Sequence, residues 1–179
     1  DYLDAAVSDD ELEALFTMAA DRRAPLFIHI RRGIAGDPSG LIEVIELAKR
    51  TGASIHICHL SASAMGGIDN FLELVDEALV EGVDISAESY PYNAGSTSIG
   101  ADVFNRDWKS IFGITYSDVQ LAETGEFFTK ARWDEVRAED PGATIIHHYG
   151  REDWTQRAMV SSAMMIGSDA MPIFSKKIK

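Results

Sequence analysis

Apolar residues occur along the chain in two patterns, a helical spacing and short continuous runs, and each pattern predicts one kind of element. Apolar spacings of three and four predict helices that begin after Ser8, at Ser39 and over 68–81. The first has the form of a capping box, in which the side chains of Ser8 and Glu11 each satisfy a backbone N–H of the other residue. Short apolar runs between the helices have the length of strands. These strands are expected at 26–30, 53–59 and 83–88.

The second half of the chain continues the alternation less regularly. A polar loop with Gly95 and Gly100 follows the third strand, and within 101–130 the pattern predicts only a short helix at 106–112. Further helices are expected at 131–139 and 151–161, and further strands at 143–148 and 164–167.

Strand–helix–strand units that repeat about every thirty residues are βαβ units, whose crossovers make the strands parallel. The pattern therefore predicts an α/β fold with about five parallel strands. An open doubly wound sheet and a closed (β/α)8 barrel both agree with it. A complete barrel takes about 250 residues, so under the barrel interpretation the 179 residues form part of one.

Composition excludes several classes of partner. With 16 basic and 29 acidic residues, the chain carries a net charge of −13, so we expect neither nucleic acid nor an anionic membrane surface to bind it. No apolar run approaches the roughly 18 residues of a membrane helix, and the acidic start lacks the pattern of a secretory signal. Cys58 is the only cysteine, which excludes an intrachain disulfide and suits a reducing cytoplasm.

Two histidines stand at equivalent places in consecutive βα units. His29 and His59 are thirty residues apart, each near the C-terminal end of its predicted strand. In parallel strands this spacing puts both imidazoles at the edge where barrels and open sheets build their sites. Strand alternation puts His59 on the face of Ile57 and turns His56 towards the helix layer. Imidazole is the commonest protein ligand of zinc and similar ions, so a metal pair and a packing role are both open.

Other residues could carry chemistry, each with an ordinary structural explanation beside it. Asp169 follows the last predicted strand, where a carboxylate can bind metal and take a proton from bound water; an Asx turn or helix N-cap ahead of Pro172 explains it equally well. The hydroxyl-rich loop 90–98 can hold a carboxylate by hydrogen bonds or lie solvated. His147-His148 is interpreted as structural, and Cys58 as a buried thiol.

Four segments together resemble a known family, the N-acyl-D-amino-acid deacylases of the amidohydrolase superfamily. Two further pieces, at 124–129 and 139–142, resemble D-glutamate deacylases and dihydroorotase-like proteins, and the resemblance runs across nearly the whole chain. The four segments are His29-Ile30-Arg31, Cys58-His59-Leu60-Ser61, Tyr90-Pro91-Tyr92 with 94–98, and Gly167-Ser168-Asp169.

The resemblance implies a distorted (β/α)8 barrel with one or two zinc ions. By position, His29 and His59 would bind one ion, and Asp169 would bind the other and shuttle the proton. Tyr92 and Ser98 fall where the deacylases hold the α-carboxylate of the substrate. The implied reaction is hydrolysis of an amide or cyclic-amide C–N bond in a small molecule, such as an N-acyl-D-amino acid, by a metal-activated water.

Two departures from the family pattern matter. The His-X-His of the first strand and a bridging Cys, Glu or carboxylated Lys belong to a part of the barrel ahead of Asp1, and the small β-domain is also absent. We therefore expect 1–179 to be a single piece of a catalytic barrel, inactive and poor at metal binding alone, with open strand edges that favour homo-oligomers. Ser61 also stands where better-known deacylases have a carboxylate-binding Lys.

Three functions stay open at this point. The first is an N-acyl-D-amino-acid deacylase, and the second is a cyclic amidase of the dihydroorotase type, which Ser61 favours. The third is a non-catalytic barrel scaffold, in which His29 and His59 only pack.

Overall fold

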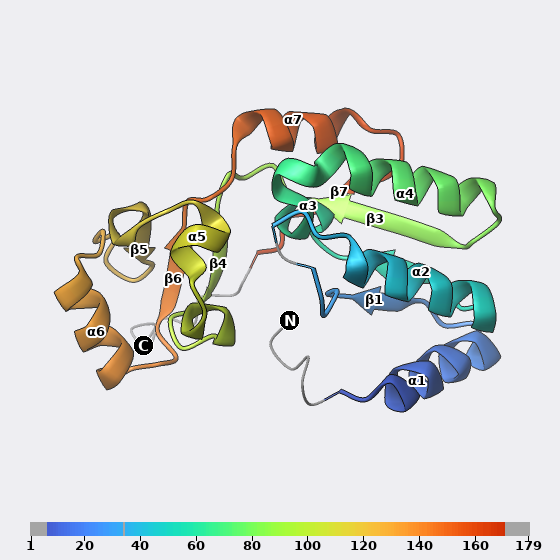
Figure 1. Cartoon of the computed structure of the whole chain (residues 1–179), viewed down its shortest axis with the longest axis horizontal. Coiled ribbons are helices and arrows are strands. Elements are labelled where there is room, and N and C mark those ends of the chain that lie inside the picture. Colours follow the sequence, from blue (N-terminus) through green and yellow to red (C-terminus); the bar gives the residue numbers. More distant parts are fainter. Residues whose placement is uncertain (1–6, 34, 171–179) are drawn as a thin grey trace, which may run out of the picture.

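Two β-sheets organise the protein, and each has its own helices (Figure 1). The computed structural model describes residues 7–33 and 35–170. In these ranges, one sheet has four parallel strands in the order β1-β2-β3-β7. The other has three antiparallel strands in the order β4-β6-β5. Residues 95–149, which contain the second sheet, are called the antiparallel unit below.

The parallel sheet follows the predicted βα pattern closely. Its core lies between the strands and the helices, where Leu41, Phe71 and Ile57 are fully buried. The strands are β1 (Leu26–Ile28), β2 (Ile55–Ile57), β3 (Ile85–Ser89) and β7 (Met164–Ile166). The helices are α1 (Asp9–Arg22), α2 (Ser39–Thr51), α3 (Leu60–Ala64), α4 (Ile68–Val80) and α7 (Glu152–Val160), with a 3-10 turn at Met65–Gly67 between α3 and α4.

Local signals at the helix ends are present, although of the predicted capping box only the Ser8 half is formed among the described contacts. The Ser8 hydroxyl accepts a hydrogen bond from the Glu11 N–H at 3.1 Å and so caps α1. At the end of α2, Gly52 takes a left-handed conformation with φ of 74° and donates its N–H to the Ala48 carbonyl at 2.8 Å. The Ser8 cap fixes where α1 begins, and the Gly52 cap fixes where the chain leaves α2 to enter β2.

The prediction of a fifth parallel strand at 143–148 is wrong, because this strand belongs to the antiparallel unit. That segment forms β6 (Thr144–His147), which pairs antiparallel with β4 (Gly95–Ser98) and β5 (Val119–Leu121). A separate core with Phe104, Trp108 and Trp133 holds the unit together. Its helices are α5 (Trp108–Phe112) and α6 (Lys130–Glu139), with 3-10 turns at Asp102–Asn105 and Tyr116–Asp118.

The antiparallel unit is an insertion between two neighbouring parallel strands. After the unit, α7 leads directly into β7, which pairs with β3 through Ala87↔Met164 and Ser89↔Ile166. The predicted helices at 106–112, 131–139 and 151–161 are present within a few residues. The unit therefore lies beyond the end of β3, next to the C-terminal edge of the parallel sheet (Figure 1).

The prediction of which β2 side chains point towards the helices is wrong. Ile57 packs in the core with the helices, whereas His56 lies on the opposite face, where its ring centroid is 5.0 Å from that of Phe27. The register pairs Phe27 with His56, so these two side chains share a face. His59 leaves the strand alternation because its backbone is left-handed, with φ of 38° at the start of α3.

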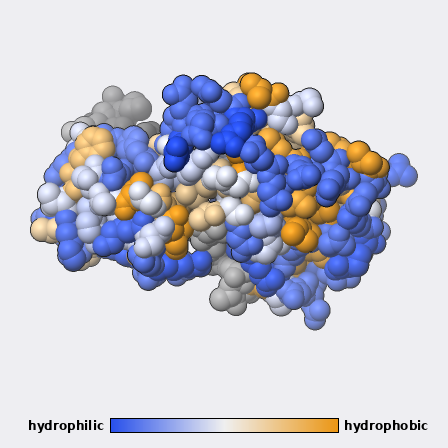
Figure 2. Space-filling model, turned by 45° about the horizontal axis from the view of Figure 1, so that its top comes forward, coloured by the Kyte–Doolittle hydropathy of each residue, from blue (hydrophilic) through white to orange (hydrophobic). Residues whose placement is uncertain are grey.

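Apolar side chains are exposed on the sheet face that lacks helices. Phe27 is 71% exposed and Met165 51% exposed. A parallel sheet with helices on one face and an open apolar face on the other is the arrangement of an incomplete barrel. The surface elsewhere is mostly hydrophilic, with a few apolar patches, as Figure 2 shows for one side. In the described part of the chain, no helix is both long and apolar enough to cross a membrane.

Candidate functional site

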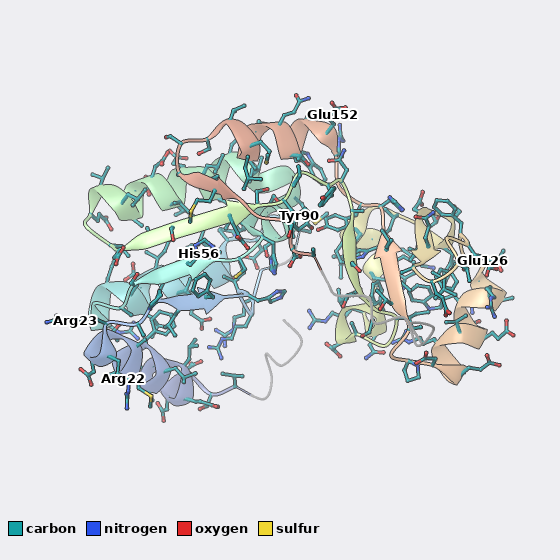
Figure 3. The ribbon with its side chains drawn as sticks, turned by 180° about the vertical axis from the view of Figure 1, so that it is seen from behind. Arg22, Arg23, His56, Tyr90, Glu126 and Glu152 are labelled. Carbon is teal, nitrogen blue, oxygen red and sulfur yellow. The ribbon has the colours of Figure 1, made fainter. Side chains whose placement is uncertain are left out.

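A cavity of about 320 Å³ lies between the C-terminal edge of the parallel sheet and the antiparallel unit. From the parallel side it is lined by His29, His59 and Asp169, the residues that the sequence predicts for the metal site. Tyr90, at the junction between the two parts, also lines it (Figure 3). The antiparallel unit contributes Gly95, Ser96, Thr97, Val103, Phe112, His147 and Tyr149.

The two strand-end histidines are in contact. Nδ1 of His29 lies 2.9 Å from Nε2 of His59, and the ring centroids are 4.7 Å apart in an edge-to-face arrangement. The Cys58 N–H donates to the Ile28 carbonyl at 3.0 Å, which continues the pairing of β1 and β2 up to the histidines. This confirms that His29 and His59 lie side by side at the C-terminal edge of adjacent parallel strands.

The surroundings of His29 favour its neutral imidazole. Burial, followed by the charge of His59, lowers the pKa of His29 from 6.5 to about 4. Nδ1 of His59 is enclosed and has no hydrogen-bond partner among the described residues. A neutral imidazole with a free lone pair is the form that binds metal ions.

The donor set fits a zinc-type ion. Two nitrogens bound to one tetrahedral zinc, with bonds of about 2.0–2.1 Å, lie about 3.3 Å apart. The 2.9 Å between His29 and His59 is close to that separation, so a small rotation of the rings would admit an ion. Their role as ligands stays a prediction.

Asp169 lies at the same cavity but does not join the histidines at one point. Its backbone is left-handed, with φ of 45°, and its side chain is exposed. In the ranges that the structure describes, no three His, Cys, Asp or Glu side chains are close enough to hold one metal ion. A shared ion for His29, His59 and Asp169 would therefore need a rearrangement of these side chains.

Cys58 lies near the site as a thiol. Burial raises its pKa, and the negative charges of Glu88 and Asp169 raise it further. A raised pKa keeps the sulfur protonated and weakly nucleophilic. This agrees with a structural role for Cys58. Nearby, His56 places Nδ1 2.8 Å from the Ser86 hydroxyl and Nε2 3.5 Å from Glu88.

His147 is a cavity residue that the sequence interpretation treated as structural. It is only 7% exposed, and its Nδ1 is enclosed without a hydrogen-bond partner among the described residues. Its ring stacks on Tyr149 with centroids 4.9 Å apart. The available signal was a histidine at the end of a strand, as at His29. Its neighbour His148 is exposed and places Nε2 2.8 Å from the Gln120 side-chain oxygen.

Comparisons with known proteins agree with these features. No family model matches the chain. N-acyl-D-glutamate deacylase from Alcaligenes xylosoxydans xylosoxydans is 30% identical over 172 residues, covering 90% of this chain and 35% of that protein. The crystal structure of N-acyl-D-glutamate deacylase from Bordetella bronchiseptica, with zinc and a phosphonate inhibitor, has a TM-score of 0.73 at 24% identity over 91% of this chain and 36% of that one. A D-aminoacylase described as defining a subset of amidohydrolases has a TM-score of 0.67 at 20% identity, with the same coverage.

The chain is thus similar in sequence to an N-acyl-D-glutamate deacylase over 90% of its own length. The expected resemblance is thus confirmed, as is the expected fold, part of a (β/α)8 barrel of the amidohydrolase kind. The chain spans about a third of the length of these relatives, with 35% and 36% covered.

The two residues predicted to hold the substrate carboxylate, Tyr92 and Ser98, do not line the cavity. Tyr92 is 59% exposed, with its ring 6.3 Å from that of Tyr90, and Ser98 is half-buried in β4. Tyr90 and Thr97, one or two positions away, line the cavity instead. The substrate role of Tyr92 and Ser98 stays a prediction.

Ser61, which replaces the lysine of better-known deacylases, is held by a neighbouring strand. The Ser89 hydroxyl donates to the Ser61 hydroxyl at 2.7 Å. Ser89 is completely buried at the end of β3. Ser61 therefore links α3 to β3 directly behind the histidine pair.

Proposed function

We propose that the chain is the C-terminal-side part of the barrel of a metal-dependent hydrolase of amide C–N bonds, of the N-acyl-D-amino-acid deacylase kind. The observation that carries this proposal is the 2.9 Å contact between His29 and His59 at the C-terminal edge of the parallel sheet. Both histidines and Asp169 line one cavity large enough for a small molecule. Residues 1–179 would form one piece of a catalytic barrel, with the antiparallel unit inserted.

Metal binding follows from the same residues. Similar structures include a zinc complex of an N-acyl-D-glutamate deacylase, a D-aminoacylase variant with copper, and a D-aminoacylase described by its binuclear metal centre. Here His29 and His59 would hold one ion and Asp169 the other, with zinc the ion that we propose. A bound ion would polarise the scissile carbonyl and lower the pKa of its water towards about 7.

The protein side chains would position the substrate and move the proton. Asp169, an exposed carboxylate at the cavity, would accept the proton of the attacking water and return it to the leaving nitrogen. The hydroxyls of Thr97 and Ser96 line the cavity beside it and can donate hydrogen bonds to a carboxylate. Tyr92 and Ser98, one or two positions from cavity residues Thr97 and Tyr90, remain candidates for holding the carboxylate.

The relatives favour the deacylase over the two alternatives. The 30% identical protein is an N-acyl-D-glutamate deacylase, and the similar structures include an N-acyl-D-glutamate deacylase and a D-aminoacylase. A ring-amide substrate has only Ser61 in its favour, and packing alone does not require two imidazole nitrogens to lie 2.9 Å apart at the edge of a cavity.

We also propose a cytoplasmic protein that self-associates. A single cysteine, Cys58, suits a reducing compartment. The strands β1 and β7 end the described parallel sheet on either side, and in residues 1–179 taken alone such open edges would readily be paired by another chain.

The test uses the full-length protein that contains these residues. Zinc content and hydrolysis of N-acetyl-D-amino acids are measured for the wild type, His29→Ala and the matched control His148→Ala, which alters an exposed histidine outside the cavity. We expect His29→Ala to lose bound metal and at least roughly a hundredfold in kcat/KM, with the control unchanged. Hydrolysis of dihydropyrimidine rings alone would favour the cyclic amidase, and absence of stoichiometric metal would favour the scaffold.

A further inference from the structure

The end of β3 lies between the two parts of the proposed metal site. β3 pairs with β2 on one side and with β7 on the other. β2 leads into His59, and β7 leads into Asp169. The last residue of β3, Ser89, is completely buried. A hydrogen bond made by Ser89 is therefore shielded from water and restrains its partner firmly.

The side chain of Ser89 holds the helix that begins at His59. Its hydroxyl donates to the Ser61 hydroxyl at 2.7 Å, and Ser61 lies two residues after His59, in the first turn of α3. His59 has a left-handed backbone, with φ of 38°, and caps α3 without a side-chain hydrogen bond. A residue other than glycine keeps this conformation only where its surroundings impose it. The contact between Ser89 and Ser61 is one such restraint.

The backbone of Ser89 holds the opposite part of the site. Its carbonyl accepts the N–H of Gly167 at 3.0 Å, which extends the pairing of β3 with β7 beyond Ile166. Gly167 also lies against Glu88, since an added Cβ at Gly167 would meet the Glu88 carboxylate at 2.6 Å. Asp169 follows two residues later, at the cavity. Ser89 therefore contacts both segments that carry the metal-site candidates.

The hydroxyl of Ser61 is directed towards β3 by this contact. Its neighbours Ala62 and Ser63 line the cavity between the sheet and the antiparallel unit, whereas Ser61 does not. The 2.7 Å hydrogen bond from Ser89 engages the Ser61 oxygen instead. This arrangement favours a role for Ser61 in holding α3 over a role in binding substrate.

We propose, on the basis of the function proposed above, that Ser89 is a positioning residue of the hydrolase. Its hydroxyl sets the position of His59 through α3, and its carbonyl sets that of Asp169 through the end of β7. Because His29 contacts His59 at 2.9 Å, the end of β3 fixes the separation between the histidine pair and the carboxylate. Ser89 thus acts on catalysis without touching metal or substrate.

Ser89→Ala in the full-length protein tests the side-chain half of this role. It removes the hydroxyl and keeps the backbone contact to Gly167. We expect the zinc affinity, measured by competition with a chromophoric chelator, and kcat for N-acetyl-D-amino acids each to fall by roughly tenfold, with KM unchanged within about twofold. The visible absorption spectrum of the cobalt(II)-substituted protein should also change, because this absorption depends on the geometry of the ligands.

Ser86→Ala is the matched control, because Ser86 bears a hydroxyl near the start of β3 that contacts His56. Both variants lose one hydroxyl contact and should lose similar stability in urea, but only Ser89→Ala should change the zinc affinity and the cobalt spectrum. Ser61→Ala removes the same contact from its other end and leaves the Ser89 hydroxyl the Tyr90 carbonyl, 3.5 Å away, as an acceptor. It should reproduce the effects of Ser89→Ala, and the double variant should be no worse than either single one.

The outcomes separate this inference from the proposed function. A wild type without stoichiometric zinc would overturn the proposed function and the inference with it. A zinc-loaded, active wild type whose Ser89→Ala variant keeps its zinc affinity, cobalt spectrum and kcat would overturn the inference alone. A rise in KM on Ser61→Ala, with the zinc affinity unchanged, would also overturn it, because the Ser61 hydroxyl would then bind substrate.

Discussion

The hydroxyl groups of Tyr90 and Tyr149 lie 3.1 Å apart, and this contact joins the end of β3 to the end of the antiparallel unit. Both side chains are at least nine-tenths buried, with exposures of 6% and 9%. Tyr90 also lies one residue after Ser89, which bonds Ser61 behind the histidine pair. A hydroxyl contact at the cavity thus ties the inserted unit to the sheet that carries the metal-site candidates.

Tyr149→Phe removes one buried hydroxyl from this junction and keeps the ring. We expect the free energy of unfolding to fall by about 1 kcal/mol, the typical net value of one hydrogen bond. Urea denaturation of the full-length protein measures it. Tyr116→Phe, at a half-buried ring of the same unit, serves as the control and should change stability by less. Equal stabilities for wild type and Tyr149→Phe would mean that the hydroxyl contact contributes nothing to the junction.

Gly95→Ala tests the close approach of β4 to the rings of His147 and Tyr149. The added methyl would meet His147 at 2.6 Å, so we expect a loss of about 1–3 kcal/mol from overpacking. Catalytic activity should fall as well, because His147 and Tyr149 line the cavity. Thermal unfolding and kcat/KM are the measurements.

The control for Gly95→Ala is Gly142→Ala. An added Cβ at Gly142 would approach only the Asp140 carboxylate, at 3.3 Å. The control should therefore be nearly neutral. A Gly95→Ala protein as stable and active as the control would show that β4 and the rings of His147 and Tyr149 can move apart freely.

The parallel part of the fold could be predicted from the sequence because its signals are local. Apolar runs and helical stripes alternate at about thirty residues, and this period alone places His29 beside His59. The face of His59 could not be predicted by alternation, since its left-handed backbone redirects the side chain. A local pattern therefore locates the pair along the chain but does not orient it.

The antiparallel strands could not be predicted from the sequence because they form only through pairing between distant segments. β4 consists of Gly95-Ser96-Thr97-Ser98, which has no apolar residue and the composition of a loop. It becomes a strand by pairing with β6, where Gly95 opposes His147. For the same reason His147 was assigned to a parallel strand, and its position in the cavity was missed.

Arg31 ties the segment after β1 to two helices. Its guanidinium donates to both Glu43 carboxylate oxygens, at 2.9 and 2.5 Å, and to Asp9 at 2.6 Å. Arg31 is 9% exposed and Glu43 17%, and the hydrogen bonds to Glu43 raise the pKa of the guanidinium further above its usual range. Loss of one partner of a buried ion pair costs about 3–5 kcal/mol.

We therefore expect Glu43→Gln to destabilise the protein by about 2–4 kcal/mol, somewhat less than full removal of the partner because the amide can still accept one hydrogen bond. Glu13→Gln is the control, since its ion pair with Arg50 is half exposed on both sides and is worth at most about 1 kcal/mol. Chemical denaturation compares the two variants. Equal losses would mean that Arg31 finds a replacement partner for Glu43.

The buried ring of His147 predicts how stability changes with pH. Its pKa is about 4 in the folded protein, lowered mainly by burial, against 6.5 for an ordinary histidine. The unfolded chain therefore binds a proton below pH 6.5 that the folded protein takes up only near pH 4. The stabilisation is fully present above pH 6.5 and is lost as the pH falls from 6.5 towards 4.

The shift corresponds to at most about 3 kcal/mol for His147. His29 titrates in the same window, so the contribution of His147 is isolated by comparing variants. We expect the free energy of unfolding to fall more steeply between pH 7 and pH 4.5 in the wild type than in His147→Gln, whatever the stability of the variant at pH 7. His148→Gln, which changes an exposed ring, should keep the wild-type slope. If His147→Gln keeps that slope as well, His147 must be protonated as easily in the folded protein as in the unfolded chain.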